Sequence, residues 1–336
     1  MTFEEIMEQI KKGLTSDKER DFSYLREQIK KYEHSEYSKA ISRECSKMMY
    51  EMLPKEALEI FESTMRKNLE VVYGELQKAD QLIKAKEYEK ALEITAELVK
   101  KADDLPMFRD DTQTAYYSFW ELFEEILYKQ IYKPTKEIKR ADYPFSTIYY
   151  LHGCALHGLE RYEEEEKYLE AARKWNPINS KIVLQYTENL KERGKLEELF
   201  VITKDLLMYT FHKDDLARCY RNLGYYFFEN EKYKEAVAAY ILSLKYDNDS
   251  EDAISDLYHI RTEAGIAAED LKDEDILAIA KEYVFIPGVS KEVLQMAYGI
   301  GNRSLENGQK VAAKYFLGIA NQYLQDTEIE KKISEL

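Results

Sequence analysis

Hydrophobic residues recur at intervals of three and four positions along most of the chain, separated by charged residues. One such stripe includes Leu82, Ala91, Leu92, Leu98 and Val99. This spacing places side chains on one face of a helix, which must then be buried against a neighbouring element. Alternation with a period of two, which is typical of strands, does not extend over a useful length. The pattern therefore predicts an all-α protein.

The regularity of the pattern divides the chain into three regions. Residues 1–70 are expected to form a helical region that is either a divergent repeat or a cap. Residues 71–325 are expected to form an array of helix pairs, with irregular segments near 107–145 and 251–289. The first of these segments is rich in aromatic residues and interrupted by prolines, so we expect an insertion there. Residues 326–336 suit a terminal capping helix, because the end of a helical stack would otherwise stay exposed.

Short polar turns interrupt the helical pattern at related intervals. They begin at Lys86, Glu160, Gly194, Glu231 and Gly308, and their starts are 74, 34, 37 and 77 residues apart. Two intervals correspond to one repeat, and the other two to a double repeat whose middle copy has diverged. A period in this range indicates a unit of two helices that completes its core only by stacking on its neighbours.

The clearest copy lies between about 217 and 250. It holds an aromatic residue, a Leu-Gly pair, a second aromatic residue and then a small and an aromatic residue on the next helix, at Tyr220, Leu223, Gly224, Phe227, Ala236 and Tyr240. This arrangement resembles the tetratricopeptide repeat, in a protein of bacterial type.

Further copies are visible on either side. One holds Tyr149, Gly153, Tyr162 and Pro177, but it has His152 where leucine is usual and Glu165 where alanine is usual. Another holds Ile300, Gly301, Ala313 and Leu317. In each copy the two positions expected to be small lie twelve residues apart across the helix turn. A small residue there lets the two helices of a pair approach closely.

The resemblance implies a right-handed superhelical α-solenoid of antiparallel helix pairs. It also implies that the first helices of successive pairs line a concave groove for a peptide. Mapped onto this sequence, the predicted peptide-binding residues are Tyr150, His157, Lys181, Glu188, Arg218, Arg221, Tyr225, Phe228, Tyr298 and Asn302. Tyrosine and arginine bury large areas at low entropic cost and dominate binding hot spots.

Composition restricts the classes of partner. The chain has 336 residues, with 49 Lys and Arg against 64 Asp and Glu, so its net charge is −15. Such a field repels phosphate backbones and argues against nucleic acid. We expect no membrane partner either, because no apolar run reaches about 20 residues. The three cysteines are scattered and no signal peptide is visible, so we expect a cytoplasmic protein.

Candidate catalytic chemistry is sparse. His152, Cys154 and His157 could be imagined as metal ligands, but the two histidines are five positions apart, whereas helical ligands pair at three or four. The repeat register instead explains His152 as a packing residue. We therefore predict no metal, no cofactor and no catalytic residues.

Two functions remain open. The first is a non-enzymatic scaffold or adaptor that binds a protein or peptide in its groove. The alternative is a regulatory protein of Gram-positive type that senses a signalling peptide. That alternative would favour a basic DNA-recognition helix near the N-terminus, but the basic residues between 26 and 47 are interleaved with Glu27, Glu33, Glu36 and Glu44. An enzyme using the aromatic segment 107–145 is a third, weaker possibility.

Overall fold

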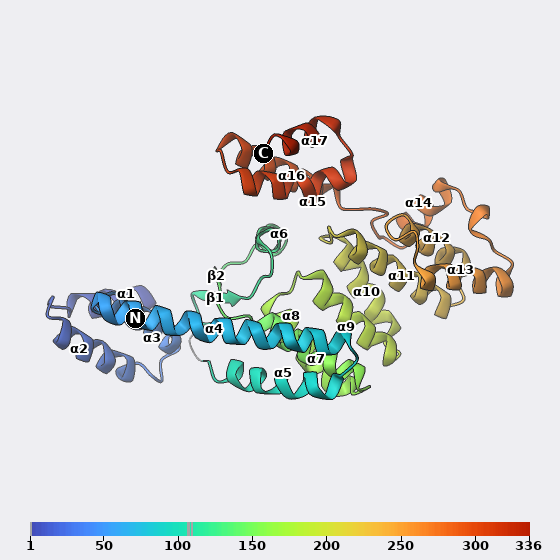
Figure 1. The fold of residues 1–336 in the computed structure, drawn as a ribbon. Helices are drawn as coiled ribbons and strands as arrows, with labels where there is room; N and C mark the ends of the chain where they lie inside the picture. The colour runs from blue at the N-terminus through green and yellow to red at the C-terminus, as the bar shows by residue number, and fades with distance from the viewer. Residues whose placement is uncertain (1, 106–107, 109) are drawn as a thin grey trace. The chain divides into compact units, whose positions relative to one another are not determined.

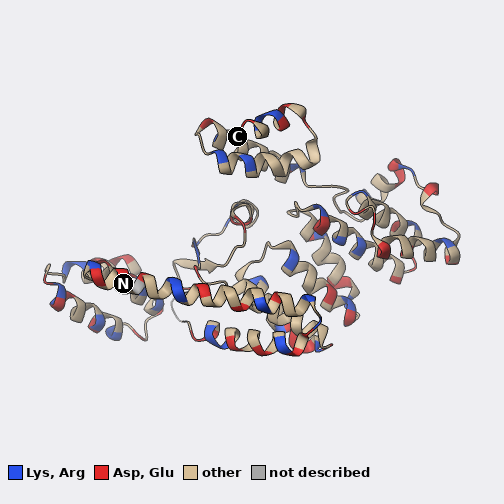
Figure 2. Ribbon diagram, in the orientation of Figure 1, with Lys and Arg blue, Asp and Glu red and all other residues tan. Residues whose placement is uncertain are grey.

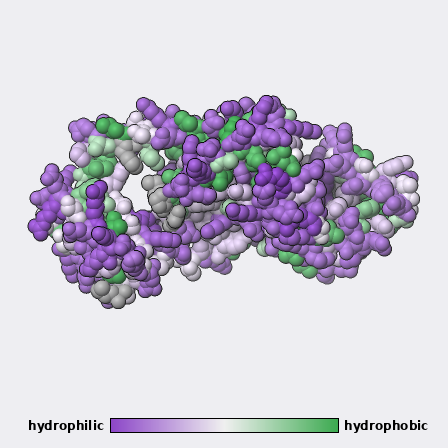
Figure 3. Space-filling model, turned by 90° about the horizontal axis from the view of Figure 1, so that it is seen from below, coloured by the Kyte–Doolittle hydropathy of each residue, from purple (hydrophilic) through white to green (hydrophobic). Residues whose placement is uncertain are grey.

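The computed structural model describes residues 2–105, 108 and 110–336, and almost all regular structure in them is helical (Figure 1). The prediction of an all-α protein made of consecutive helix pairs is confirmed. The chain divides into two compact units, Met1–Pro177 and Ile178–Leu336, which we describe separately. Acidic and basic residues are interspersed along the helices of both (Figure 2). On the face shown in Figure 3, hydrophobic residues are scattered among hydrophilic ones.

The first unit begins with three short helices, α1 (Phe3–Lys12), α2 (Lys18–Lys31) and α3 (Ser38–Glu51). Thr2 and Glu5 form a capping box at the start of α1, and Asp17 caps α2. Their apolar faces meet in a small core that includes Ile6, Ile10, Leu25, Ile41 and Cys45. The three amphipathic helices therefore form a core of their own at this end of the chain.

Two helix pairs follow in the same unit. They are α4 (Lys55–Lys84) with α5 (Tyr88–Asp103), and α7 (Phe145–Gly158) with α8 (Tyr162–Trp175). The boundary expected at residue 70 falls inside α4, which is continuous. Helix α7 packs on α5 as well as on α8, so neighbouring pairs share one core.

The segment between these pairs holds the strands β1 (Thr114–Tyr117) and β2 (Glu137–Arg140), joined by α6 (Leu122–Tyr132). The two strands pair in parallel, with Thr114 opposite Glu137. The sequence pattern did not predict this sheet, because four residues are too few to establish a period of two. Residues 107 and 109 of the predicted insertion lie outside the described residues.

The second unit continues the series of pairs. Its elements are α9 (Ser180–Glu192), α10 (Leu196–Leu207), α11 (Lys213–Glu229), α12 (Tyr233–Leu244), α13 (Glu251–Ala264), the 3-10 turn η2 (Ala268–Asp270), α14 (Asp273–Glu282), α15 (Lys291–Glu306), α16 (Lys310–Leu324) and α17 (Thr327–Ser334). Tyr220, Phe227 and Tyr240 are almost completely buried where α11 packs on α12. The aromatic positions of the clearest repeat copy are therefore core positions.

The glycines of three first helices receive a large side chain from the second helix. A Cβ added to Gly153, Gly224 or Gly301 would lie 2.6–2.7 Å from the side chain of Leu169, Tyr240 or Leu317. Each of these partners lies sixteen residues after its glycine, which is a contact that the twelve-residue spacing did not predict. The residues twelve positions after these glycines are nevertheless buried. Ala236 follows Gly224 and Ala313 follows Gly301 at this distance.

The turns inside the helix pairs share one backbone conformation. The residues that begin the five polar turns of the sequence pattern all have left-handed φ angles, namely Lys86 (60°), Glu160 (59°), Gly194 (65°), Glu231 (57°) and Gly308 (71°). Lys86, Glu160 and Glu231 carry a Cβ, and a residue with a Cβ is strained at left-handed φ angles. The repeat in the sequence is therefore a repeat of turn geometry.

A glycine at one of these strained turns should stabilise the protein. We expect Glu231→Gly to raise the free energy of unfolding by about 0.5–1 kcal/mol, since the relief of left-handed strain exceeds the added backbone entropy. Gly194→Ala should lower it, because it introduces the same strain. Urea denaturation of both variants checks this. Equal stabilities for the wild type and both variants would contradict it.

Candidate functional site

Four of the predicted groove residues line one pocket in the second unit. Glu188 on α9 and Arg218, Arg221 and Tyr225 on α11 face a space of about 550 Å³. The remaining lining residues are Lys191, Asn222, Asp252, Ser255 and Asp256. The pocket is thus formed by α9, α11 and α13, the first helices of three successive pairs.

Charged side chains on α9 and α11 hold one another in place. The Glu188 carboxylate lies 3.2 Å from the Lys191 ammonium and 3.5 Å from the Arg218 guanidinium. Burial raises the pKa of Glu188, but the two cations and their hydrogen bonds outweigh burial and lower it below its ordinary value. The Lys191 ammonium also lies 5.4 Å from the centre of the Tyr225 ring. This side of the pocket therefore presents two cations and an aromatic face.

Arg221 has a bracing contact as well as a place in the pocket wall. Its Nη1 donates to Asp247 (3.0 Å), Ser250 (3.2 Å) and Ser243 (3.3 Å), and its side chain is 19% exposed. These bonds join α11 to the end of α12 and the start of α13. Replacing Arg221 would therefore disturb the packing of the helices as well as the pocket.

The acidic side of the pocket was missed in the sequence. Asp252 and Asp256 lie four residues apart on α13, and both line the pocket. The repeat motif is not legible between 251 and 289, so no groove residue was assigned there. The i, i+4 spacing of the two carboxylates on a first helix is the signal that could have identified them.

Other predicted groove residues of this unit lie apart from the pocket lining. Phe228 packs on Tyr233 and His259, with ring centres 5.8 and 5.4 Å apart. Lys181 is exposed near the start of α9. On α15, Asn302 Oδ1 accepts a hydrogen bond from Lys332 of α17, whose ammonium also lies 6.0 Å from the Tyr298 ring centre. The terminal helix α17 thus contacts the predicted face of the last pair.

The two predicted residues of the first unit contact other parts of that unit. Tyr150 meets Trp120 of the inserted segment edge to face, with ring centres 5.5 Å apart. His157 Nδ1 lies 3.0 Å from the fully buried carboxylate of Glu165. The histidines considered as metal ligands have separate partners, because His152 bonds Thr95 instead. No cluster of three potential ligands occurs in the described part of the chain.

The buried cysteines have the properties of packing residues. Burial raises the pKa of the Cys45 thiol to about 11, and burial also raises the pKa of Cys219. Their thiolates are therefore scarce near neutral pH, and the thiolate is the reactive form. Both side chains are inaccessible to solvent, so neither is suited to nucleophilic chemistry.

Comparisons with known proteins agree with the geometry of the helix pairs. Residues 146–179, which contain α7 and α8, match the family model of the tetratricopeptide repeat. No curated protein matches the chain. Within the described residues, no helix has both the length and the apolar character needed to cross a membrane. The matched repeat, together with the consecutive packed helix pairs, supports a tetratricopeptide repeat protein.

Proposed function

We propose that this chain is a non-enzymatic scaffold or adaptor that binds a peptide segment of a partner protein along α9, α11 and α13. The observation that carries this proposal is the pocket of about 550 Å³ to which these three first helices contribute side chains. A tetratricopeptide repeat supports a role in protein interaction. An extended peptide suits such a surface, because it can contact several helices in succession.

The charges around the pocket define the peptide that would fit. Lys191 and Arg218 lie on the α9 and α11 side, and Asp252 and Asp256 lie on the α13 side. A peptide would be complementary in charge if it placed an acidic residue opposite the two cations and a basic residue opposite the two aspartates. Tyr225 offers a half-buried ring between α9 and α11 as the apolar anchor. We expect a dissociation constant of about 1 µM, because ordering an extended peptide offsets much of the contact energy.

A peptide library displayed on phage tests the proposal. Peptides selected on the wild-type protein should bind the double variant Arg218→Ala and Tyr225→Ala at least about 30-fold more weakly, since loss of a hot-spot residue costs about 2 kcal/mol or more. Arg221 is left unchanged because it braces α11.

A second double variant is the control. Val311→Ala and Lys314→Ala alter two exposed residues of α16, away from the pocket lining. It should bind the selected peptides normally, and both double variants should keep the wild-type melting temperature. Unchanged binding by the Arg218 and Tyr225 variant would refute the site, as would equal losses in the two variants.

A further inference from the structure

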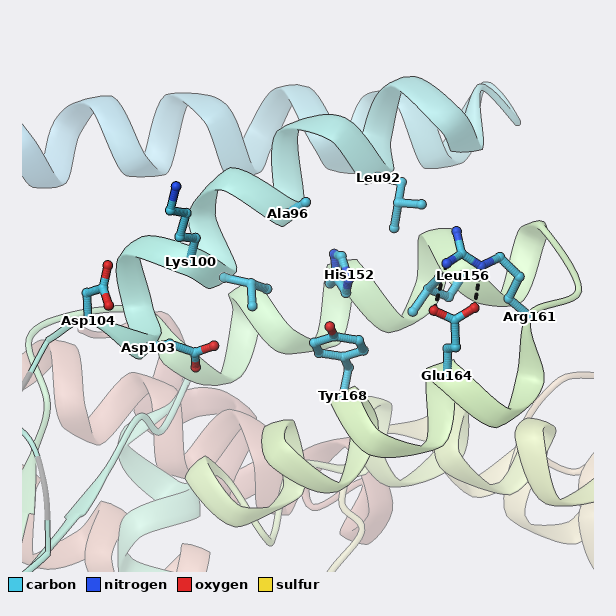
Figure 4. A pocket seen from close by; sticks show the side chains of 11 residues that line it. Leu92, Ala96, Lys100, Asp103, Asp104, His152, Leu156, Arg161, Glu164 and Tyr168 are labelled. Carbon is cyan, nitrogen blue, oxygen red and sulfur yellow. Dashed lines mark hydrogen bonds and ion pairs between the residues drawn. The ribbon is translucent and has the colours of Figure 1, made fainter.

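A second pocket lies in the first unit, between α5 and α8 (Figure 4). Its volume is about 490 Å³, which is in the range of small-molecule sites. Leu92 and Val99 of α5, Leu156 of α7 and the ring of Tyr168 on α8 provide apolar walls. His152 of α7 projects between them and is 6% exposed. None of the predicted groove residues lines this pocket.

The contacts of Thr95 bear on which nitrogen of His152 carries the proton. Its Nδ1 lies 2.9 Å from the Thr95 hydroxyl, which is itself buried. That hydroxyl also lies 2.9 Å from the carbonyl oxygen of Ala91 and 3.2 Å from that of Leu92, two atoms that can only accept. We assign the hydroxyl proton to these carbonyl oxygens, so that Thr95 accepts from His152, Nδ1 is protonated and Nε2 keeps its lone pair. Nε2 has no hydrogen-bond partner among the residues that the structure describes.

A histidine at this position departs from the other copies of the repeat. The equivalent residue, just before the glycine of the first helix, is Leu223 in one copy and Ile300 in another. An apolar residue would fill the place without leaving a polar nitrogen to be satisfied. Departures from a local packing rule tend to occur where function requires them. A histidine nitrogen without a partner beside the apolar walls of this pocket is such a departure.

Five charged residues line the pocket, among them Lys100 and Asp104, and the other three have partners within the protein. At one end Arg161 makes two 2.7 Å hydrogen bonds to Glu164. At the other end Tyr149 donates to Asp103 at 2.5 Å. Burial first, and then the charge of Arg161, lower the pKa of His152 to about 4. Both causes disfavour any further positive charge beside Nε2, and a ligand with acceptors alone could not bond to it.

We propose that this pocket binds a neutral aromatic ring carrying an N–H or O–H donor, such as an indole or a phenol, with the donor directed at His152 Nε2. The ring body would pack on Leu92, Val99 and Leu156, and Tyr168 would add an edge-to-face contact. The ring could come from a free small molecule or from a Trp or Tyr side chain of a partner. This site is independent of the groove in the second unit.

Two probes that differ only in the donor test the hydrogen bond. Wild-type protein should bind indole about tenfold more tightly than 1-methylindole in calorimetric titrations, because only indole can donate to Nε2. His152→Leu should bind the two compounds equally. A wild-type protein that binds neither probe at millimolar concentration, or both equally, would overturn the proposal. So would a preference for indole that persists in His152→Leu.

A spectroscopic measurement keeps the test independent of that variant's folding. In wild-type protein labelled with ¹⁵N-histidine, the His152 ring should show the Nδ1–H tautomer, and its Nε2 resonance should shift when indole is added. The opposite tautomer, or an unchanged Nε2 resonance with saturating indole, would refute the assignment. Binding of a blocked pentapeptide with one central Trp as tightly as indole would point to a protein partner, and binding of indole alone to a free ligand.

Discussion

Between pH 6.5 and pH 4, the free energy of unfolding of His152→Leu should fall by about 3 kcal/mol less than that of the wild type. His152 has a pKa of about 4 in the folded protein and an ordinary value of 6.5, and each pKa unit corresponds to about 1.4 kcal/mol. Between pH 6.5 and pH 4 the unfolded chain binds the proton and the folded protein does not. Protonation therefore favours unfolding, so this contribution to stability is complete above pH 6.5 and falls as the pH is lowered to 4.

Urea denaturation at pH 7 and at pH 4.5 measures this effect. The wild type should lose more stability between the two pH values than His152→Leu, and at pH 7 the variant should be at least as stable, because leucine suits the packing position. His34→Leu is the control, because the side chain of His34 is 94% exposed. Equal pH dependence in the wild type and His152→Leu would show that folding does not lower the pKa of His152.

Gly224→Ala should destabilise the protein by about 2–3 kcal/mol. The new Cβ would lie 2.6 Å from the ring of Tyr240, which is 1% exposed and cannot move aside without disturbing the core between α11 and α12. Overpacking of this kind costs about 1–3 kcal/mol or more, which exceeds the gain in helix propensity.

Gly299→Ala is the matched control. Gly299 also lies within a helix, α15, but apart from its chain neighbours and the backbone of its own helix no atom comes within 4 Å of its added Cβ. This variant should be about 0.5–1 kcal/mol more stable than the wild type, since alanine favours the helix. Thermal and urea unfolding measure the change in stability of each variant relative to the wild type. A neutral Gly224→Ala would mean that α11 and α12 are not packed as closely as the structure shows.

Local chemistry made the helix pairs predictable. The polar turns begin at residues with left-handed backbone, and a short turn leaves its two helices side by side and antiparallel. The glycines of the first helices α7, α11 and α15 were also identifiable, because a residue without a side chain permits such close packing. The identity of its partner, sixteen positions on, depended on how the two helices cross, which spacing along the chain does not specify.

The candidate groove was predictable only in part. Glu188, Arg218, Arg221 and Tyr225 could be assigned from the repeat register, and they do line one pocket. The register could not show that Arg221 braces α11, nor that Trp120 packs on Tyr150. Both contacts join residues whose separation in the sequence is unrelated to the repeat period.

The sequence by itself determined the helical class, the positions of the turns and the helix faces that must be buried, because these follow from backbone preferences and hydrophobic periodicity over a few residues. The tertiary structure alone decided which side chains meet between pairs. His152 illustrates the difference: its register identified it as a packing residue, but its tautomer depends on Thr95, 57 residues away. A hydrogen bond between separate helices is set by how they pack, and that packing brought a neutral imidazole to the wall of a pocket.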